Sequence, residues 1–193
     1  LIAKQGYNQV GSGYGNYVLV ISAGYHKIEQ GQGDLIYTAD NRFGIETVWD
    51  GFTLTDGYLD SRSLPNLSGN IRNGGAGAAI FTNVILKNCI VTANKNTSTN
   101  TGQEIRGGVY CDEGTLVNCY ILNNTLGGSN QYTAYGGGCY MYKGTAYNCV
   151  ISENETIGQH GDGAGIFIEN AAFYNNTIVK NTATVTTRGN GGI

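Results

Sequence analysis

The sequence predicts an all-β fold, a right-handed, single-stranded parallel β-helix with three short strands in each coil of 27–30 residues. Three observations lead to this prediction. Similar segments recur at spacings of 30, 30 and 27 residues, and short alternating apolar runs lie between Gly and Asn residues. Only 13% of the residues are charged, about half of the usual share. Such a solenoid buries its hydrophobic columns only when its coils stack on one another.

The composition excludes several other classes of protein. Among the 193 residues are 31 Gly and only one Met, which does not suit a helical protein because Gly and Asn are poor helix formers. A hydrophobic share of 40% and 14 Tyr argue against disorder. The net charge of −3 without a basic stripe predicts no nucleic-acid partner. No apolar run approaches the roughly 18 residues of a membrane span, so we expect none.

The repeat is recognised by Gly, Tyr, Gly-Thr, Asn-Cys, Ile and Asn at matching positions. Its copies occupy residues 78–94, 108–124, 138–154 and 165–181. Residues 45–193 are therefore expected to form the β-helix, and residues 1–44 to form amino-terminal strands, either a cap or irregular first coils. Because Gly192 and Ile193 begin another copy and Leu1 is not a Met, we expect the chain to be part of a longer solenoid.

Alternation along each strand assigns side chains to the inner and outer faces of the coil. The expected inward columns are Ala79, Val109, Cys139 and Ile166; Phe81, Cys111, Met141 and Ile168; Leu86, Leu116, Ala146 and Phe173; and Val91, Ile121, Ile151 and Ile178. The column of Ile80, Tyr110, Tyr140 and Phe167 is expected to point outward.

Two columns of Asn are expected at corners of the coil, because Asn tolerates the left-handed backbone conformation and its amide can bond to the next coil. The first column, predicted to stack at one corner as a structural ladder, is Asn88, Asn118, Asn148 and Asn175. The second is Asn94, Asn124, Asn154 and Asn181.

Three of the five cysteines, Cys89, Cys119 and Cys149, fall at the same place in successive coils. In-register side chains point in parallel, which disfavours the dihedral angle of a disulfide. Neither a Cys-x-x-Cys pair nor a Cys/His mixture is present for a metal. We therefore expect a column of buried free thiols that belongs to the structural ladder, with all five Cys unbridged, no metal site and no cofactor.

Candidate binding residues lie on the aromatic column and in the insertions after the second Asn column. Stacked aromatic rings on an exposed β face could bind sugars, but they also stabilise a sheet as cross-strand pairs. The insertions 95–107, 125–137, 155–164 and 182–191 are expected to be polar loops on one edge, serving either as a solvated edge or as a binding surface. The candidates are Tyr110, Tyr140, Tyr142 and Phe167, with His160 and Asp162 in a Gly-rich loop.

No catalytic residue is predicted. Glycoside hydrolysis uses two carboxylates within roughly 5–10 Å. In the aligned coils Asp112 lies between Thr82 and Tyr142, and Glu113 lies next to Lys143. No acid of these coils falls above another acid.

Three motifs carry a resemblance to a known family. They are Asp-Gly-Phe-Thr-Leu-Thr at 50–55, Gly-Gly-Gly-x-Tyr at 136–140 and Asn-Cys-x-Ile-x-x-Asn at 148–154. The pattern resembles the right-handed β-helix repeat proteins that many Bacteroidetes secrete, and it is distantly similar to the chlamydial polymorphic outer membrane proteins. The resemblance implies an extracellular or outer-cell-surface location. It leaves function open, because such proteins include both adhesins and carbohydrate-active enzymes.

Two hypotheses about function follow. The first is a non-enzymatic secreted or cell-surface module of the adhesin, stalk or passenger type, whose partner is a cell-surface glycan or another surface protein. The alternative is part of a carbohydrate-active β-helix enzyme, a polysaccharide lyase or a glycoside hydrolase.

Overall fold

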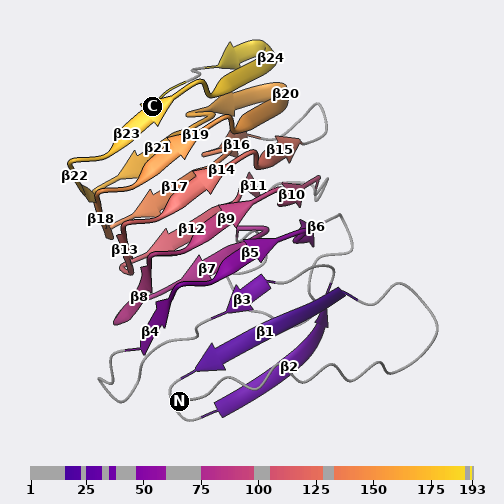
Figure 1. Cartoon of the computed structure of the whole chain (residues 1–193). Coiled ribbons are helices and arrows are strands. Elements are labelled where there is room, and N and C mark those ends of the chain that lie inside the picture. Colours follow the sequence, from indigo (N-terminus) through magenta and orange to yellow (C-terminus); the bar gives the residue numbers. More distant parts are fainter. Residues whose placement is uncertain are drawn as a thin grey trace.

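The computed structural model shows a solenoid of stacked strands (Figure 1). It describes residues 16–22, 25–31, 35–37, 47–59, 75–97, 105–127, 133–189 and 192. All regular elements in these ranges are strands, and successive coils pair in parallel. The right-handed parallel β-helix predicted from the repeat is confirmed.

The three short strands of each repeat build three of the four sides of the coil. The first side contains β7 (Ala78–Ile80), β12 (Val109–Asp112), β17 (Cys139–Tyr142) and β21 (Ile166–Glu169). The second contains β4 (Thr47–Asp50), β8 (Val84–Lys87), β13 (Thr115–Val117), β18 (Thr145–Tyr147) and β22 (Ala172–Tyr174). The third contains β5 (Thr53–Thr55), β9 (Ile90–Thr92), β14 (Tyr120–Leu122), β19 (Val150–Ser152) and β23 (Thr177–Val179). We call them the first, second and third sheets.

A fourth sheet is made by the insertions, and here the expectation of loops was wrong. It contains β6 (Tyr58–Leu59), β10 (Lys95–Asn96), β11 (Ile105–Arg106), β15 (Thr125–Gly127), β16 (Thr133–Tyr135), β20 (Glu155–Asp162) and β24 (Thr182–Gly189). Strand β20 pairs with β15 through its first half and with β16 through its second half. Strands β15 and β16 therefore run in the same direction, one after the other, along this side of the coil before the next repeat begins.

The amino-terminal strands extend the first sheet. Strands β1 (Asn16–Ser22) and β2 (Tyr25–Gly31) form an antiparallel pair, and β1 pairs in parallel with β3 (Leu35–Tyr37). Strand β3 in turn pairs in parallel with β7. The backbone pairing thus continues from the repeats into the amino-terminal region.

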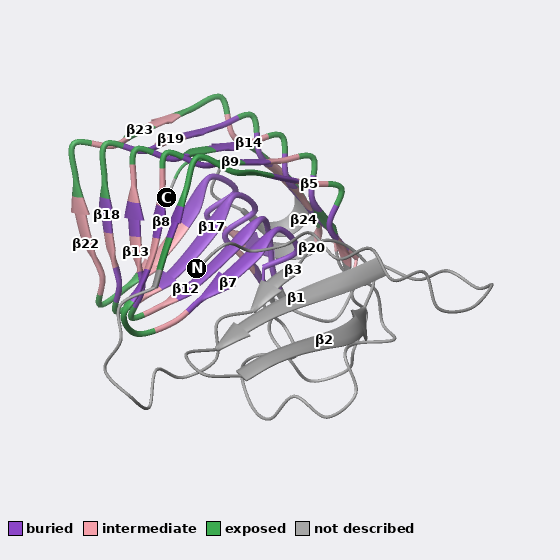
Figure 2. Cartoon of the chain, turned by 60° about the horizontal axis from the view of Figure 1, so that its bottom comes forward, coloured by how far each residue is buried: buried purple, intermediate pink, exposed green. Residues whose placement is uncertain are grey.

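Figure 2 shows that the strands of successive coils carry buried residues, and their buried apolar side chains form one cluster inside the coil. Parallel pairing places Leu116 between Leu86 and Ala146, and Ile121 between Val91 and Ile151. These six side chains are buried, as expected for inward columns. Stacking makes one continuous core from segments that could not bury their own apolar faces alone.

At β7 the sequence alignment was wrong by one residue. Val109 pairs with Ala78 and Cys111 with Ile80, so Ile80 belongs to the core and Ala79 lies in the column of Tyr110. The expected inward positions of Ala79 and Phe81 are corrected accordingly. The reason is the corner: Leu86 follows Ile80 by 6 residues, whereas Leu116 follows Cys111 by 5. The corner after β7 is therefore one residue longer, and an alignment of the repeats without gaps cannot account for that residue.

The second Asn column is a buried amide ladder. Asn94, Asn124 and Asn154 each donate from Nδ2 to Oδ1 of the next Asn of the column, at 2.9, 2.9 and 3.0 Å, the last to Asn181. Each Nδ2 also donates to a backbone carbonyl, that of Val91 in the case of Asn124, at 3.0 Å. The left-handed residue at this corner is the one before each Asn, namely Ala93, Asn123, Glu153 and Lys180. The second column therefore satisfies buried backbone groups and does not supply the turn.

Glycine allows the start of each repeat to approach this ladder. A Cβ on Gly138 would lie 2.6 Å from Nδ2 of Asn154 and 2.6 Å from the carbonyl oxygen of Gly165. Neither atom can move away without breaking a hydrogen bond of the amide ladder or displacing the backbone of the next coil. The Gly that opens each repeat is thus required by packing.

Candidate functional site

The aromatic column that was expected to be exposed is instead the centre of a second hydrophobic core. Tyr110 and Tyr140 are only 1% and 4% exposed. They point away from the main core, as alternation indicated, but they pack with Ala76 and Ala79 and against the partly buried Phe81, Tyr135, Tyr142 and Phe167. The expected exposure of Tyr110 and Tyr140 was therefore wrong, and their burial favours the alternative that these rings stabilise the sheet as cross-strand pairs.

The second strands of two insertions, β11 and β16, cover these rings. Arg106 of β11 places its guanidinium carbon 4.5 Å from the ring centroids of both Tyr110 and Tyr140. Tyr135 of β16 packs 4.4 Å from the ring centroid of Phe167. Burial raises the pKa of the Tyr110 and Tyr140 hydroxyls. These hydroxyls donate hydrogen bonds to carboxylates: Tyr110 to Asp112 at 3.1 Å, and Tyr140 to Glu169 at 2.7 Å.

Of the remaining predicted site residues, Tyr142 packs at the edge of this second core, whereas His160 and Asp162 belong to the fourth sheet. Tyr142 is half-buried at the corner, with the Lys143 ammonium 4.8 Å from its ring centroid. His160 and Asp162 lie in strand β20, not in a loop, and they pair in register with Thr133 and Tyr135. Asp162 is half-buried, and its backbone oxygen accepts a hydrogen bond from Gly136. The side chain of His160 lies outside the described part.

The stacked thiols occupy a corner of the main core, as predicted. All five cysteines are free and buried. The thiol of Cys119 donates to the carbonyl oxygens of Leu86 and Val117, each at 3.3 Å. A hydrogen bond to Cys149 raises the pKa of Cys119 to about 12, and the same contact lowers the pKa of Cys149. In the following coil Asn176 takes the thiol position and donates to the carbonyl oxygen of Ala146 at 3.0 Å. The column of thiols, continued by Asn176, thus donates hydrogen bonds to backbone carbonyl groups at this corner.

Charged side chains on the outside of the coil meet the opposite charge of the neighbouring coil. The pairs are Lys87–Asp50 at 3.7 Å, Lys143–Glu113 at 3.4 Å and Lys180–Glu153 at 3.9 Å. Hydrogen bonds from Thr82 and Lys143 lower the pKa of Glu113, whereas burial raises the pKa of the adjacent Asp112. In the described residues, stacking has thus placed a lysine beside each of these three exposed carboxylates.

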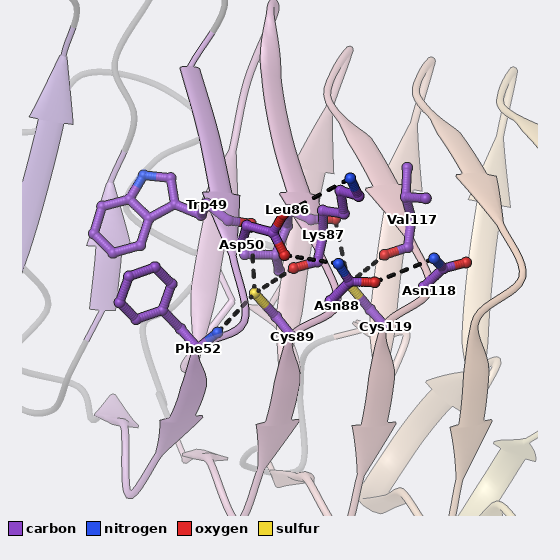
Figure 3. A network of polar contacts seen from close by, with 10 residues as sticks. All are labelled: Trp49, Asp50, Phe52, Leu86, Lys87, Asn88, Cys89, Val117, Asn118 and Cys119. Carbon is purple, nitrogen blue, oxygen red and sulfur yellow. Dashed lines mark hydrogen bonds and ion pairs between the residues drawn. The ribbon is translucent and has the colours of Figure 1, made fainter. Parts of the chain in front are cut away.

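The first Asn column stacks at the exposed corner between the second and third sheets, as predicted. Asn88, Asn118, Asn148 and Asn175 all have positive φ angles of 51–53°. Asn118 donates to Asn88 at 3.1 Å, and Asn88 donates to Asp50 at 2.7 Å (Figure 3). At the far end, Asn175 donates to Asn148.

Exposed tyrosines flank this corner. They are not among the binding residues that the sequence predicted. Tyr147 and Tyr174 follow Val117 in one outward column of the second sheet and are 41% and 54% exposed. Their rings stack at a centroid distance of 5.1 Å and an interplanar angle of 16°. Tyr120, which is 50% exposed, lies on the other side of the corner in the third sheet. The signal that could have found the pair is the repeat itself, because Tyr147 and Tyr174 are 27 residues apart at the same position.

No group of three or more His, Cys, Asp or Glu in the described residues is arranged to hold a metal ion. Within the same residues, no helix is long and apolar enough to cross a membrane.

Comparison with known proteins found no matching family model, no matching curated protein and no matching solved structure. The resemblance to the secreted β-helix repeat proteins therefore stays a prediction from the sequence.

Proposed function

We propose that the chain is a non-enzymatic binding segment of a secreted or cell-surface β-helix protein, of the adhesin, stalk or passenger type. Its partner is a cell-surface glycan or another surface protein. The alternative is part of a polysaccharide lyase or glycoside hydrolase.

The observation that carries this choice is the charge pairing across coils. A retaining or inverting hydrolase holds two carboxyl groups on one site, about 5–10 Å apart. On the outside of this solenoid Asp50, Glu113 and Glu153 each lie within 4 Å of a lysine on the next coil. A carboxylate paired with a lysine is favoured in its charged form and is poorly suited to act as a general acid. Beside these pairs, the corner between the second and third sheets exposes tyrosine rings and carboxamides, which suits binding.

The test is to incubate the chain with immobilised neutral and acidic polysaccharides and to measure both retention and products. Retention without new reducing ends or unsaturated sugars is the expected result. Release of either product by the chain, and not by a heat-inactivated sample, would establish the enzymatic alternative and overturn the proposal.

A further inference from the structure

The exposed Asn ladder is interrupted at one step. Asn118 uses its Nδ2 to reach Asn88, and Asn148 uses its Oδ1 to accept from Asn175. Among the described residues, Oδ1 of Asn118 and Nδ2 of Asn148 have no hydrogen-bond partner. In Figure 3 the Oδ1 of Asn118 points away from Asn88, toward the next coil. One acceptor and one donor are therefore open to solvent on neighbouring coils.

The aromatic column beside the ladder stops at the same step. Asn118 directly follows Val117, and Asn148 directly follows Tyr147. Nearly parallel rings 5.1 Å apart cannot lie side by side in one plane, so the faces of Tyr147 and Tyr174 point mainly along the solenoid axis. One face of Tyr147 packs on Tyr174. The other face lies over Val117, a shorter side chain without a ring.

The column thus has no ring at Val117, which leaves one face of Tyr147 without a stacked partner. Neighbouring strands of a sheet are about 4.8 Å apart, so a planar or chair-shaped ring can lie on Tyr147 beyond the end of the Val117 side chain. The next member of the column, Lys87, is already paired with Asp50. A ring placed there would contact the Tyr147 ring on one face and the amides of Asn118 and Asn148 at its side. The charged residue of this column nearest to it, Lys87, is already paired.

We propose that Tyr147, Asn118 and Asn148 form a subsite for one pyranose ring of a neutral glycan. The polarised C–H face of the sugar stacks on the Tyr147 ring above Val117, because the ring face carries partial negative charge. A sugar hydroxyl both donates and accepts, so it can donate to Oδ1 of Asn118 while it accepts from Nδ2 of Asn148. This inference rests on the proposed binding function and names the class of partner.

The test measures the affinity of the whole chain for an array of neutral glycans, with cellohexaose and mannohexaose among the probes and oligogalacturonate as the anionic comparison. The wild type is expected to bind neutral glycans. Tyr147→Ala should weaken binding by about tenfold through loss of the stacking surface. Asn148→Gly, which keeps the positive φ, should weaken it by about threefold through loss of one hydrogen bond.

Two further variants distinguish a loss of binding at the subsite from a loss of folded structure. Val117→Tyr continues the aromatic column, which stabilises the sheet, and it should abolish binding because the new ring fills the subsite. Tyr120→Ala removes an equally exposed tyrosine across the corner and should bind like the wild type.

The proposal is overturned if no neutral glycan binds, or if Tyr147→Ala and Val117→Tyr bind like the wild type. It is also overturned if Val117→Tyr abolishes self-association of the chain and leaves glycan binding unchanged, because the face is then an interface between two copies. Product release from the wild type would instead refute the proposed non-enzymatic function, so the two failures are distinguishable.

Discussion

At the scale of single residues, the two Asn columns perform different tasks. The exposed column supplies left-handed corners, and the buried column satisfies backbone groups inside the coil. Asn124 is fully buried, accepts from the backbone nitrogen and Nδ2 of Asn94, and donates to Val91 and Asn154. Its loss leaves several buried polar groups without partners.

We therefore expect Asn124→Ala to lower the free energy of unfolding by about 3 kcal/mol. The control is Asn118→Gly, which removes an exposed amide and keeps the positive φ, and it should cost about 1 kcal/mol or less. Urea unfolding followed by circular dichroism measures both values. Equal losses would show that the buried ladder has no special role.

Adjacent carboxylates at one corner should respond to pH with opposite signs. The folded state lowers the pKa of Glu113 through hydrogen bonds from Thr82 and Lys143, so Glu113 stabilises the fold at neutral pH and this contribution is lost as the pH falls. Burial raises the pKa of Asp112, so its ionisation destabilises the fold as the pH rises.

Glu113→Gln should therefore melt below the wild type at neutral pH, and the difference should shrink as the pH falls below about 4. Asp112→Asn should gain melting temperature relative to the wild type as the pH rises from about 3 to about 6. Thermal melts across this range test both signs. Curves that shift in parallel for the two variants would contradict the assigned environments.

The residue scale also shows what the sequence could reveal. The positive φ of Asn118 was predictable, because Asn is the common non-Gly residue in that conformation and it recurs in register. The positive φ of Ala93, Glu153 and Lys180 was not, because their side chains carry no turn signal and the surrounding coils impose the conformation.

At the scale of elements, strands β11 and β16 of the insertions cover the aromatic face of the first sheet. Alternation correctly placed Tyr110 on the outer face of its strand, but it cannot reveal whether another element covers that face. The cover comes from β11 and β16, which have only two and three residues and are too short for alternation to mark them as strands. The second core was therefore beyond sequence reasoning, whereas the three strands of each repeat were not.

The second core predicts a contrast between two tyrosines. Tyr110→Ala should lower the free energy of unfolding by about 4 kcal/mol, since the ring is buried between Arg106, Phe81 and Tyr140. Tyr120→Ala should cost less than about 0.5 kcal/mol, since half of that side chain is exposed. Chemical denaturation measures both, and similar losses would place Tyr110 at the surface.

At the scale of the whole molecule, the solenoid is stabilised by nearest neighbours. Strands β12, β13 and β14 pair on both sides, whereas β21, β22 and β23 pair on one side in the described residues. The inward Phe173 and Ile178 are accordingly only partly buried, while Leu116 and Ile121 are fully buried. Stability in repeat proteins is approximately a sum of such neighbour terms.

Hydrogen exchange should therefore be faster in residues 165–181 than in residues 108–124. The comparison is made in a monomeric sample by exchange coupled to mass spectrometry, because opening of the last coil breaks fewer neighbour contacts. Equal protection of the two segments would mean that the molecule opens only as one unit.

The register between coils is the central claim, and contacts between side-chain amides test it most directly. The measurement is a nuclear Overhauser experiment on the Asn-labelled chain, with assignments from single substitutions. The account predicts cross-peaks that join Asn94, Asn124, Asn154 and Asn181 in order, at separations of 30, 30 and 27 residues. Amide cross-peaks confined to residues close in sequence, with none between successive members of this column, would contradict the stacked coil.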